Sequence, residues 1–144
     1  MPSEHPSVDV RGPRFAAWVT SAVLAVALLL GAGWLVAAQA VVFAIGAFAG
    51  MRRAPYAVAF RVLFAPRLRP GREREPEAPL RFAQLVGLVF ALTGAAGYLL
   101  GVPVLGAVAT GLALVAALLN AATGFCLGCE LHLLLRRALP ARTA

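Results

Sequence analysis

Four long apolar stretches without a charged side chain most constrain what this chain can fold into. They are residues 15–30, 34–50, 82–100 and 104–122. Each is close to the roughly 17–25 residues with which a helix crosses a bilayer. A chain that is 61% hydrophobic and 13% charged has too little polar surface to cover a soluble globule. The sequence therefore predicts an all-α integral membrane protein, with the lipid bilayer as its main partner.

The connections between these stretches predict how the helices pair. Gly31-Ala32-Gly33 separates the first two stretches and Gly101-Val102-Pro103 the last two, and neither leaves room for more than a tight turn. We therefore expect four transmembrane helices arranged as two hairpins. They form one membrane domain at residues 11–138, between a disordered lead at residues 1–10 and a short tail at residues 139–144.

The basic residues predict the orientation. All 13 are arginines, and they lie before the first stretch, in the loop at residues 51–81 and after the last stretch, never in a hairpin turn. By the positive-inside rule the N and C termini and this loop are cytoplasmic, in the plasma (inner) membrane of the cell. The net charge of +7 then reflects orientation and lipid contact, with no nucleic-acid partner.

A cleavable signal peptide is the alternative interpretation of the first apolar stretch, which follows Arg11 and Arg14. The stretch lacks a small-x-small cleavage site, so we expect it to stay as a span.

The cytoplasmic loop has two parts. Pro55 is suited to a first helical position, and apolar residues recur after it at helical spacing: Tyr56, Phe60, Leu63 and Phe64. We expect a short helix lying in the headgroup plane. Residues 66–79 are rich in Pro, Arg and Glu and cannot bury enough apolar area to order themselves, so a solvated linker is expected there.

The last apolar stretch is too long for one span. Continued to Leu135 it would form a helix of about 48 Å, against a hydrocarbon core of about 30 Å. Thr123-Gly124 is the expected break. A second helix, at about residues 125–137, would then follow the cytoplasmic interface. Three leucines would face lipid on it: Leu131, Leu134 and Leu135.

Two cysteines on this interfacial helix carry the only recognisable chemistry. On a helix, Cys126 and Cys129 have Cα atoms about 5 Å apart, within the roughly 4.4–6.8 Å that a disulfide tolerates. A helix N-terminus lowers a thiol pKa, which makes Cys126 the expected attacking thiol and Cys129 the resolving one. Burial and the neighbouring Glu130 act in the opposite direction. In a reducing cytoplasm the resting pair is expected as a dithiol.

Other interpretations of the pair stay open. The cysteines could serve packing in a non-catalytic membrane scaffold or assembly subunit. They could also bind zinc together with His132, one ligand short of a closed site, or Cu(I), which accepts fewer thiolates. A haem attachment site is excluded because Glu130, not histidine, follows Cys129. No cofactor is indicated, and the oligomeric state is left open.

Inside the predicted spans the polar side chains are few and neutral, which disfavours proton or ion transport. Three Gly-x-x-x-Gly spacings could allow close helix packing, at Gly46 to Gly50, Gly97 to Gly101 and Gly124 to Gly128. In a chain with 14 glycines such spacings also arise by chance.

Several short motifs resemble a known family. They are Val8-Asp9, Arg11 to Phe15, Gln39, Gly46-Ala47-Phe48, Pro55-Tyr56, Pro79 to Gln84 and Gly124 to Glu130. Over residues 8–138 the chain is similar to the small bacterial membrane proteins named domain of unknown function 4395 (DUF4395). The resemblance implies a role in thiol redox or sulfur relay through Cys126 and Cys129, with a thioredoxin-like or sulfurtransferase partner. It also implies an aromatic residue where this chain has His132, which argues against His132 as a ligand.

Overall fold

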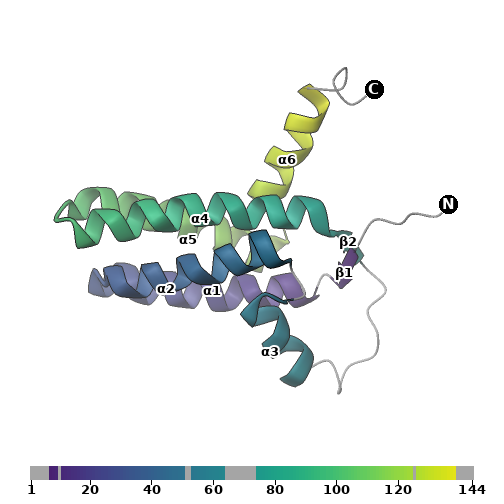
Figure 1. The fold of residues 1–144 in the computed structure, drawn as a ribbon, viewed down its shortest axis with the longest axis horizontal. Coiled ribbons are helices and arrows are strands. Elements are labelled where there is room, and N and C mark those ends of the chain that lie inside the picture. The colour runs from purple at the N-terminus through teal and green to yellow at the C-terminus, as the bar shows by residue number, and fades with distance from the viewer. Residues whose placement is uncertain (1–6, 10, 51–52, 64–73, 125, 139–144) are drawn as a thin grey trace.

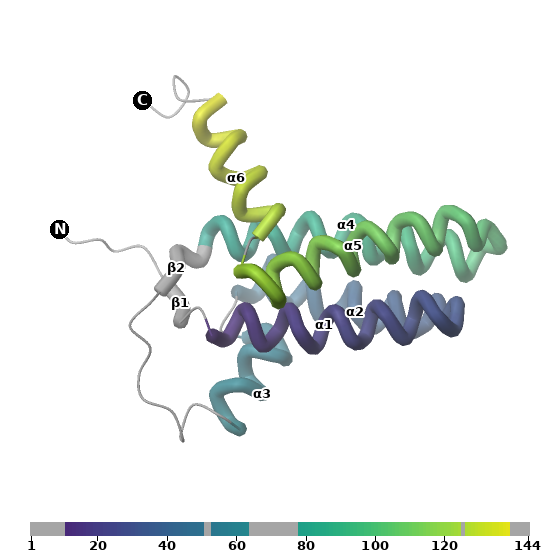
Figure 2. The backbone as a smooth tube through the Cα atoms, turned by 180° about the vertical axis from the view of Figure 1, so that it is seen from behind, coloured from purple at the N-terminus to yellow at the C-terminus, as the bar shows by residue number. Residues whose placement is uncertain are grey.

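The computed structural model describes residues 7–9, 11–50, 53–63, 74–124 and 126–138. Its helices are α1 (Arg11–Leu30), α2 (Gly33–Ala44), the π-helical turn η1 (Ile45–Ala49), α3 (Pro55–Leu63), α4 (Glu77–Leu99), α5 (Pro103–Thr123) and α6 (Leu127–Ala138). Helices α1, α2, α4 and α5 lie side by side as a bundle, and α3 and α6 project from the same end of it (Figures 1 and 2). Around the bundle, α1 contacts α2 and α5, and α4 also contacts both.

Three helices in the described part of the chain are long and apolar enough to cross a membrane: Arg11–Leu30, Ala78–Leu99 and Pro103–Thr123. The other bundle helix, Gly33–Ala49, is apolar but shorter. It ends at Gly50, whose φ of 105° turns the chain away from the helix. The structure thus gives three candidate spans of full length where the sequence predicted four.

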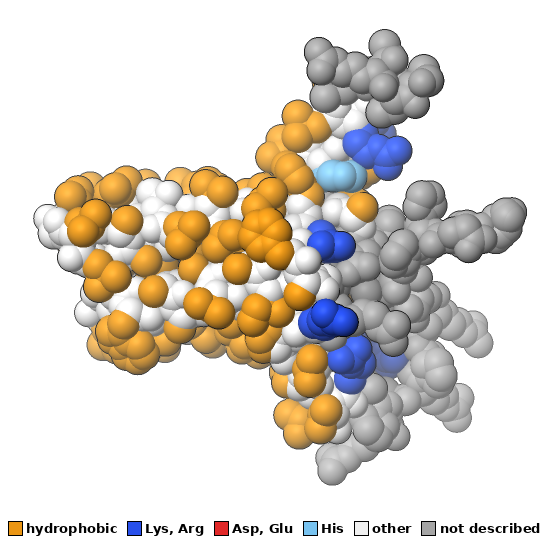
Figure 3. Space-filling model, in the orientation of Figure 1, with side chains coloured by type: hydrophobic (Ala, Val, Ile, Leu, Met, Phe, Trp, Pro, Cys, Tyr) orange, Lys and Arg blue, Asp and Glu red, His pale blue; other side chains and the backbone are white. Residues whose placement is uncertain are grey.

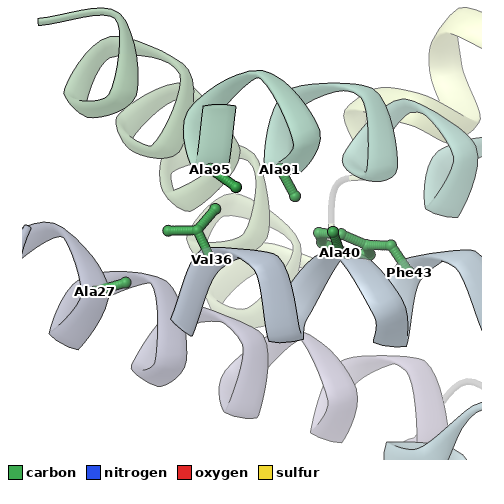
Figure 4. Close-up of a cluster of buried hydrophobic side chains, with 6 residues drawn as sticks. All are labelled: Ala27, Val36, Ala40, Phe43, Ala91 and Ala95. Carbon is green, nitrogen blue, oxygen red and sulfur yellow. The ribbon is translucent and has the colours of Figure 1, made fainter. Parts of the chain in front are cut away.

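Small side chains fill the bundle, and large ones cover it. The central cluster consists of Ala27, Val36, Ala40, Phe43, Ala91 and Ala95, drawn from α1, α2 and α4 (Figure 4). On the outside, Leu29 is 85% exposed and Leu100 is 79% exposed. A soluble bundle buries its leucines, whereas membrane helices pack through small residues and turn their large apolar side chains to lipid. The distribution agrees with an integral membrane protein.

Glycines at two of the predicted spacings lie in close contacts between helices. A Cβ atom on Gly97 of α4 would collide with the backbone of Gly106 in α5, so a larger side chain there would push these two helices apart. A Cβ atom on Gly46 would lie 2.7 Å from the Gln84 Oε1 of α4, so a larger side chain there would displace the Gln84 side chain.

Polar side chains dock α3 against the bundle. The Tyr56 hydroxyl donates a hydrogen bond of 2.7 Å to the Oε1 of Gln39, a residue that is fully buried in α2. The Gln39 Nε2 lies 3.5 Å from the Thr20 Oγ1 of α1. Burial raises the pKa of Tyr56, which keeps its phenol protonated as a donor. One buried amide thus connects α1, α2 and α3.

Helix α3 begins at Pro55, as expected. The Phe60 ring is buried and lies 5.7 Å from the Phe15 ring of α1, so part of the aromatic face contacts protein. That the helix lies in the headgroup plane stays a prediction. Val58, Val62 and Leu63 remain exposed. Phe64 lies outside the described residues.

Arginines gather at one end of the bundle (Figure 3), and two of them cap helices. The Arg14 Nη2 at the start of α1 donates to the carbonyl oxygens of Ala121 (2.9 Å) and Ala122 (3.5 Å) in the last turn of α5. Arg81, near the start of α4, donates to the carbonyl oxygens of Ala47 (3.0 Å) and Phe48 (3.1 Å) in η1. Cations at helix C-termini satisfy unpaired carbonyls and offset the helix dipole.

Two short strands modify the predicted all-α fold. β1 (Ser7–Asp9) pairs antiparallel with β2 (Arg74–Pro76), with Val8 opposite Glu75. One strand falls in the predicted disordered lead, and the other in the predicted linker. Each segment is too polar to order alone, but pairing satisfies the backbone groups of both. The composition of each segment by itself does not predict pairing between segments that are far apart in the sequence.

Candidate functional site

The helix break before the cysteines lies where the sequence predicted it. Helix α5 ends at Thr123, and the capping residue Gly124 has a φ of 78°, in the left-handed region. Its N–H donates to the Asn120 carbonyl oxygen at 2.8 Å, which satisfies one unpaired carbonyl of the last turn. Glycine adopts this conformation without a Cβ penalty. The chain then resumes as α6 at Leu127.

Cys126 caps the start of α6. Its carbonyl oxygen accepts the first helical hydrogen bond, from the Glu130 N–H at 3.0 Å. Its Sγ accepts a hydrogen bond from the Cys129 N–H at 3.1 Å, so sulfur takes the place of the usual capping oxygen. The sequence predicted Cys126 in the first turn of this helix, and the structure has it immediately before that turn.

The two cysteines are joined in the structure. Cys126 and Cys129 form a disulfide with a Cα–Cα distance of 5.1 Å, and both residues are partly buried. The separation matches that expected for positions i and i+3 of a helix. The structure holds the oxidised pair, whereas the dithiol expected in a reducing compartment stays a prediction.

Close contacts hold α6 against α4. A Cβ atom on Gly128 would lie 2.6 Å from both the Cα and the Cβ of Ala83, so only glycine fits here without a shift. The His132 ring packs against the Phe82 ring, with centroids 5.5 Å apart. The third predicted glycine spacing therefore places Gly128 at a helix contact and Gly124 at the break.

The metal alternative gains no support from this geometry. Among the described residues, no group of three or more His, Cys, Asp or Glu side chains is placed to hold a metal ion. The His132 Nδ1 is buried without a hydrogen-bond partner in the described part of the chain, and the ring contacts an aromatic side chain. This is the environment expected where the family resemblance implies an aromatic residue.

Three leucines of α6 are exposed, Leu131, Leu134 and Leu135. That they face lipid stays a prediction. Arg136 and Arg137 lie in the last turn, where cations interact favourably with the helix dipole. The helix leaves the bundle at a steep angle to the bundle axis (Figure 2).

A cavity of about 310 Å³ lies beside the disulfide, between α1, α4, α5 and α6. Cys126 and Leu131 belong to its wall, and its polar side chains are Thr20, Gln84 and Asn120. The sequence did not single out Gln84 and Asn120 as site residues. The sequence did indicate that both are neutral polar residues within apolar stretches, near the segments that contain the arginines.

Among known proteins, the chain matches one family model. The family model described as "Domain of unknown function (DUF4395)" matches residues 8–137. The chain belongs to this family. No curated protein and no solved structure matches it. The DUF4395 match covers the whole bundle and the cysteine pair.

Proposed function

We propose that this DUF4395 protein is a four-span membrane protein whose cysteine pair exchanges electrons or sulfane sulfur with a soluble thioredoxin-like or sulfurtransferase protein. The observation that carries the proposal is the hydrogen bond from the Cys129 N–H to the Cys126 Sγ at the start of α6. A backbone donor and a helix N-terminus stabilise a thiolate, so the Cys126 pKa is expected below the free-thiol value of about 8.5. The thiolate is the form that reacts.

The chemistry is thiol–disulfide exchange. A partner thiolate bonds to the Cys126 Sγ while the Cys126–Cys129 bond breaks, and Cys129 leaves as thiolate. The partner's second thiol then attacks the partner sulfur of this mixed disulfide and releases Cys126. Two electrons and two protons pass from the partner dithiol to the pair. With a partner persulfide, the reduced Cys126 thiolate instead takes the outer sulfur, and the partner leaves as thiolate.

The partner can be trapped through the resolving cysteine. The exchange is reversible, so the reduced Cys126 thiolate also attacks a partner disulfide, and Cys129 then attacks the Cys126 Sγ and releases the partner as a thiol. Cys129→Ser removes this resolving thiol but keeps the backbone N–H that faces Cys126. This variant should accumulate a reductant-sensitive covalent adduct in cells, and Cys126→Ser should accumulate little. The adduct mass, measured by mass spectrometry, distinguishes a thioredoxin-like protein from a sulfurtransferase or a small thiol.

Two other results would replace the proposal. If neither variant forms an adduct and both thiols of the wild type alkylate equally slowly in detergent, the cysteines serve packing in a membrane scaffold. If neither forms an adduct and purified wild type retains copper or zinc that the double Ser variant lacks, the pair binds metal.

We further propose that the charged end of the bundle faces the cytoplasm and that Gly33–Ala49 is the fourth span. Its shorter length is compatible with an upright helix beside three longer, tilted ones. The interface then lies at the level of the arginines, where α3 and α6 project and anionic headgroups attract positive charge (Figure 3).

Single cysteines in a background without the native pair test this topology. Leu30→Cys and Leu100→Cys, at the exposed tips of the bundle, should react with an impermeant maleimide added to intact cells. Leu63→Cys and Arg137→Cys, both exposed at the other end, should react only after permeabilisation. Labelling of a tip and of the arginine end from the same side would refute the four-span topology.

A further inference from the structure

The cavity beside the disulfide is built for a neutral, largely apolar molecule. Of the described residues that line it, none is charged, and most are Ala, Leu, Val or Phe. An unpaired ionic ligand would lose several kcal/mol or more on transfer to such surroundings. Its volume of about 310 Å³ is at the lower end of the range of ligand pockets. The cavity is partly open. Because the bundle is proposed to lie in the membrane, the occupant would come from the lipid phase.

Two amides offer hydrogen bonds to this occupant. Gln84 and Asn120 line the cavity from α4 and α5, and neither side chain forms a hydrogen bond with another described residue. The Gln84 side chain also lies against Gly46, where a larger residue would displace it. Both residues are partly buried, and amide donors in an otherwise apolar cavity favour an occupant with two hydrogen-bond acceptors.

The cysteine pair supplies the reason to expect redox chemistry. Cys126 forms part of the cavity wall, so a bound molecule would lie next to the sulfur that is proposed to react. Oxidation of a dithiol releases two electrons and two protons. A membrane-soluble quinone is neutral, carries two carbonyl acceptors, and takes up two electrons and two protons. The quinone ring matches the cavity in polarity. It accepts the same number of electrons and protons as the dithiol releases.

We propose that this cavity binds the head group of a quinone, which reoxidises the Cys126–Cys129 dithiol. The inference rests on the proposed exchange with a thiol partner, which would leave the pair reduced. The Cys126 thiolate adds to a ring carbon of the quinone. Cys129 then attacks the Cys126 Sγ, the carbon–sulfur bond breaks, and its electron pair returns to the ring. The two protons of the dithiol end on the ring oxygens, which gives the disulfide and a hydroquinone.

The test uses the purified full chain in lipid nanodiscs, reduced and freed of reductant, with decylubiquinone as the probe. Wild type should reduce about one quinone per protein, and the reaction is measured by the loss of quinone absorbance. Over the same time its thiols should become resistant to alkylation. Ala116→Phe fills the cavity from α5 and should slow this reaction at least tenfold. Ala96→Phe adds the same ring to an exposed position of α4 outside the cavity and should react like wild type.

Two further variants keep the test decisive if Ala116→Phe does not fold. Gln84→Leu and Asn120→Leu are similar in size to the residues they replace and break no hydrogen bond between described residues. Each should raise the quinone concentration for half-maximal rate severalfold.

Quinone reduction that is equally fast in all cavity variants would place the reaction on the surface and overturn the inference. If wild type reduces no quinone while Cys129→Ser still traps a partner, the cavity inference fails and the proposed function stands. If no partner is trapped but quinone is reduced in a cavity-dependent way, the proposed function fails instead.

Discussion

Gly128→Leu should release α6 from α4 and expose the reduced cysteine pair to water-soluble reagents. The substituted side chain would begin 2.6 Å from the Ala83 backbone, so the clash cannot be relieved by rotating a flexible neighbour. Overpacking of this kind costs about 1–3 kcal/mol. That cost shifts the docking equilibrium of α6 roughly 5- to 150-fold. The alkylation rate of the pair by an impermeant maleimide, measured in permeabilised membranes, should rise accordingly.

Gly111→Leu is the matched control. Gly111 lies in α5, and a Cβ atom there would meet nothing within 4 Å. The control should fold and label like wild type, since its added side chain has open space. An unchanged labelling rate in Gly128→Leu would mean that α6 is not held by this contact. The Phe82–His132 pair would then be the next contact to test.

The bundle was largely predictable because its signals are local. Apolar length predicts helices, and the glycine turns predict where they end. The bounds of the second apolar helix were predicted to within one residue, since residues 34–50 were expected and the helix is Gly33–Ala49. The sequence did not predict the π-helical turn Ile45–Ala49 with which this helix closes. The length of the apolar stretch alone does not decide whether this shorter helix crosses the bilayer.

Contacts between distant segments could not be predicted in this way. The α3 sequence has an apolar face, which suits lipid and protein equally well. Its position is decided by the hydrogen bond from Tyr56 to Gln39 and by the packing of Phe60 on Phe15. Partners of this kind are 17 or more residues apart, and amphipathic periodicity does not record them.

The site was predicted in part. A break at Thr123-Gly124 follows from helix length and from glycine, and it puts the first cysteine near a helix start. The cap itself depends on the direction in which the chain leaves Gly124, and the cavity depends on how four helices meet. Gln84 and Asn120 gain significance only from that assembly.

The break can be tested by making the chain prefer one continuous helix. Gly124→Ala places a Cβ at a φ of 78°, which costs a residue other than glycine about 1–2 kcal/mol. Alanine also favours a helix interior over glycine by about 1 kcal/mol. Both effects act against the break, so α5 should tend to continue through Cys126. Gly111→Ala has the same helix preference at an ordinary helical position and serves as the control.

Thiol reactivity is the measurement that reports the break. In a Cys129→Ser background, Cys126 alone is alkylated, and the backbone donor at residue 129 is retained. With Gly124 present, the half-maximal pH of alkylation should lie below the free-thiol value of about 8.5. With Gly124→Ala, the N–H of residue 129 would bond within the continuous helix and no longer face the sulfur, so the half-maximal pH should rise to about 8.5 or above. Equal values for Gly124→Ala and Gly111→Ala would show that the helix start does not activate Cys126. The proposed exchange would then lose the observation that carries it.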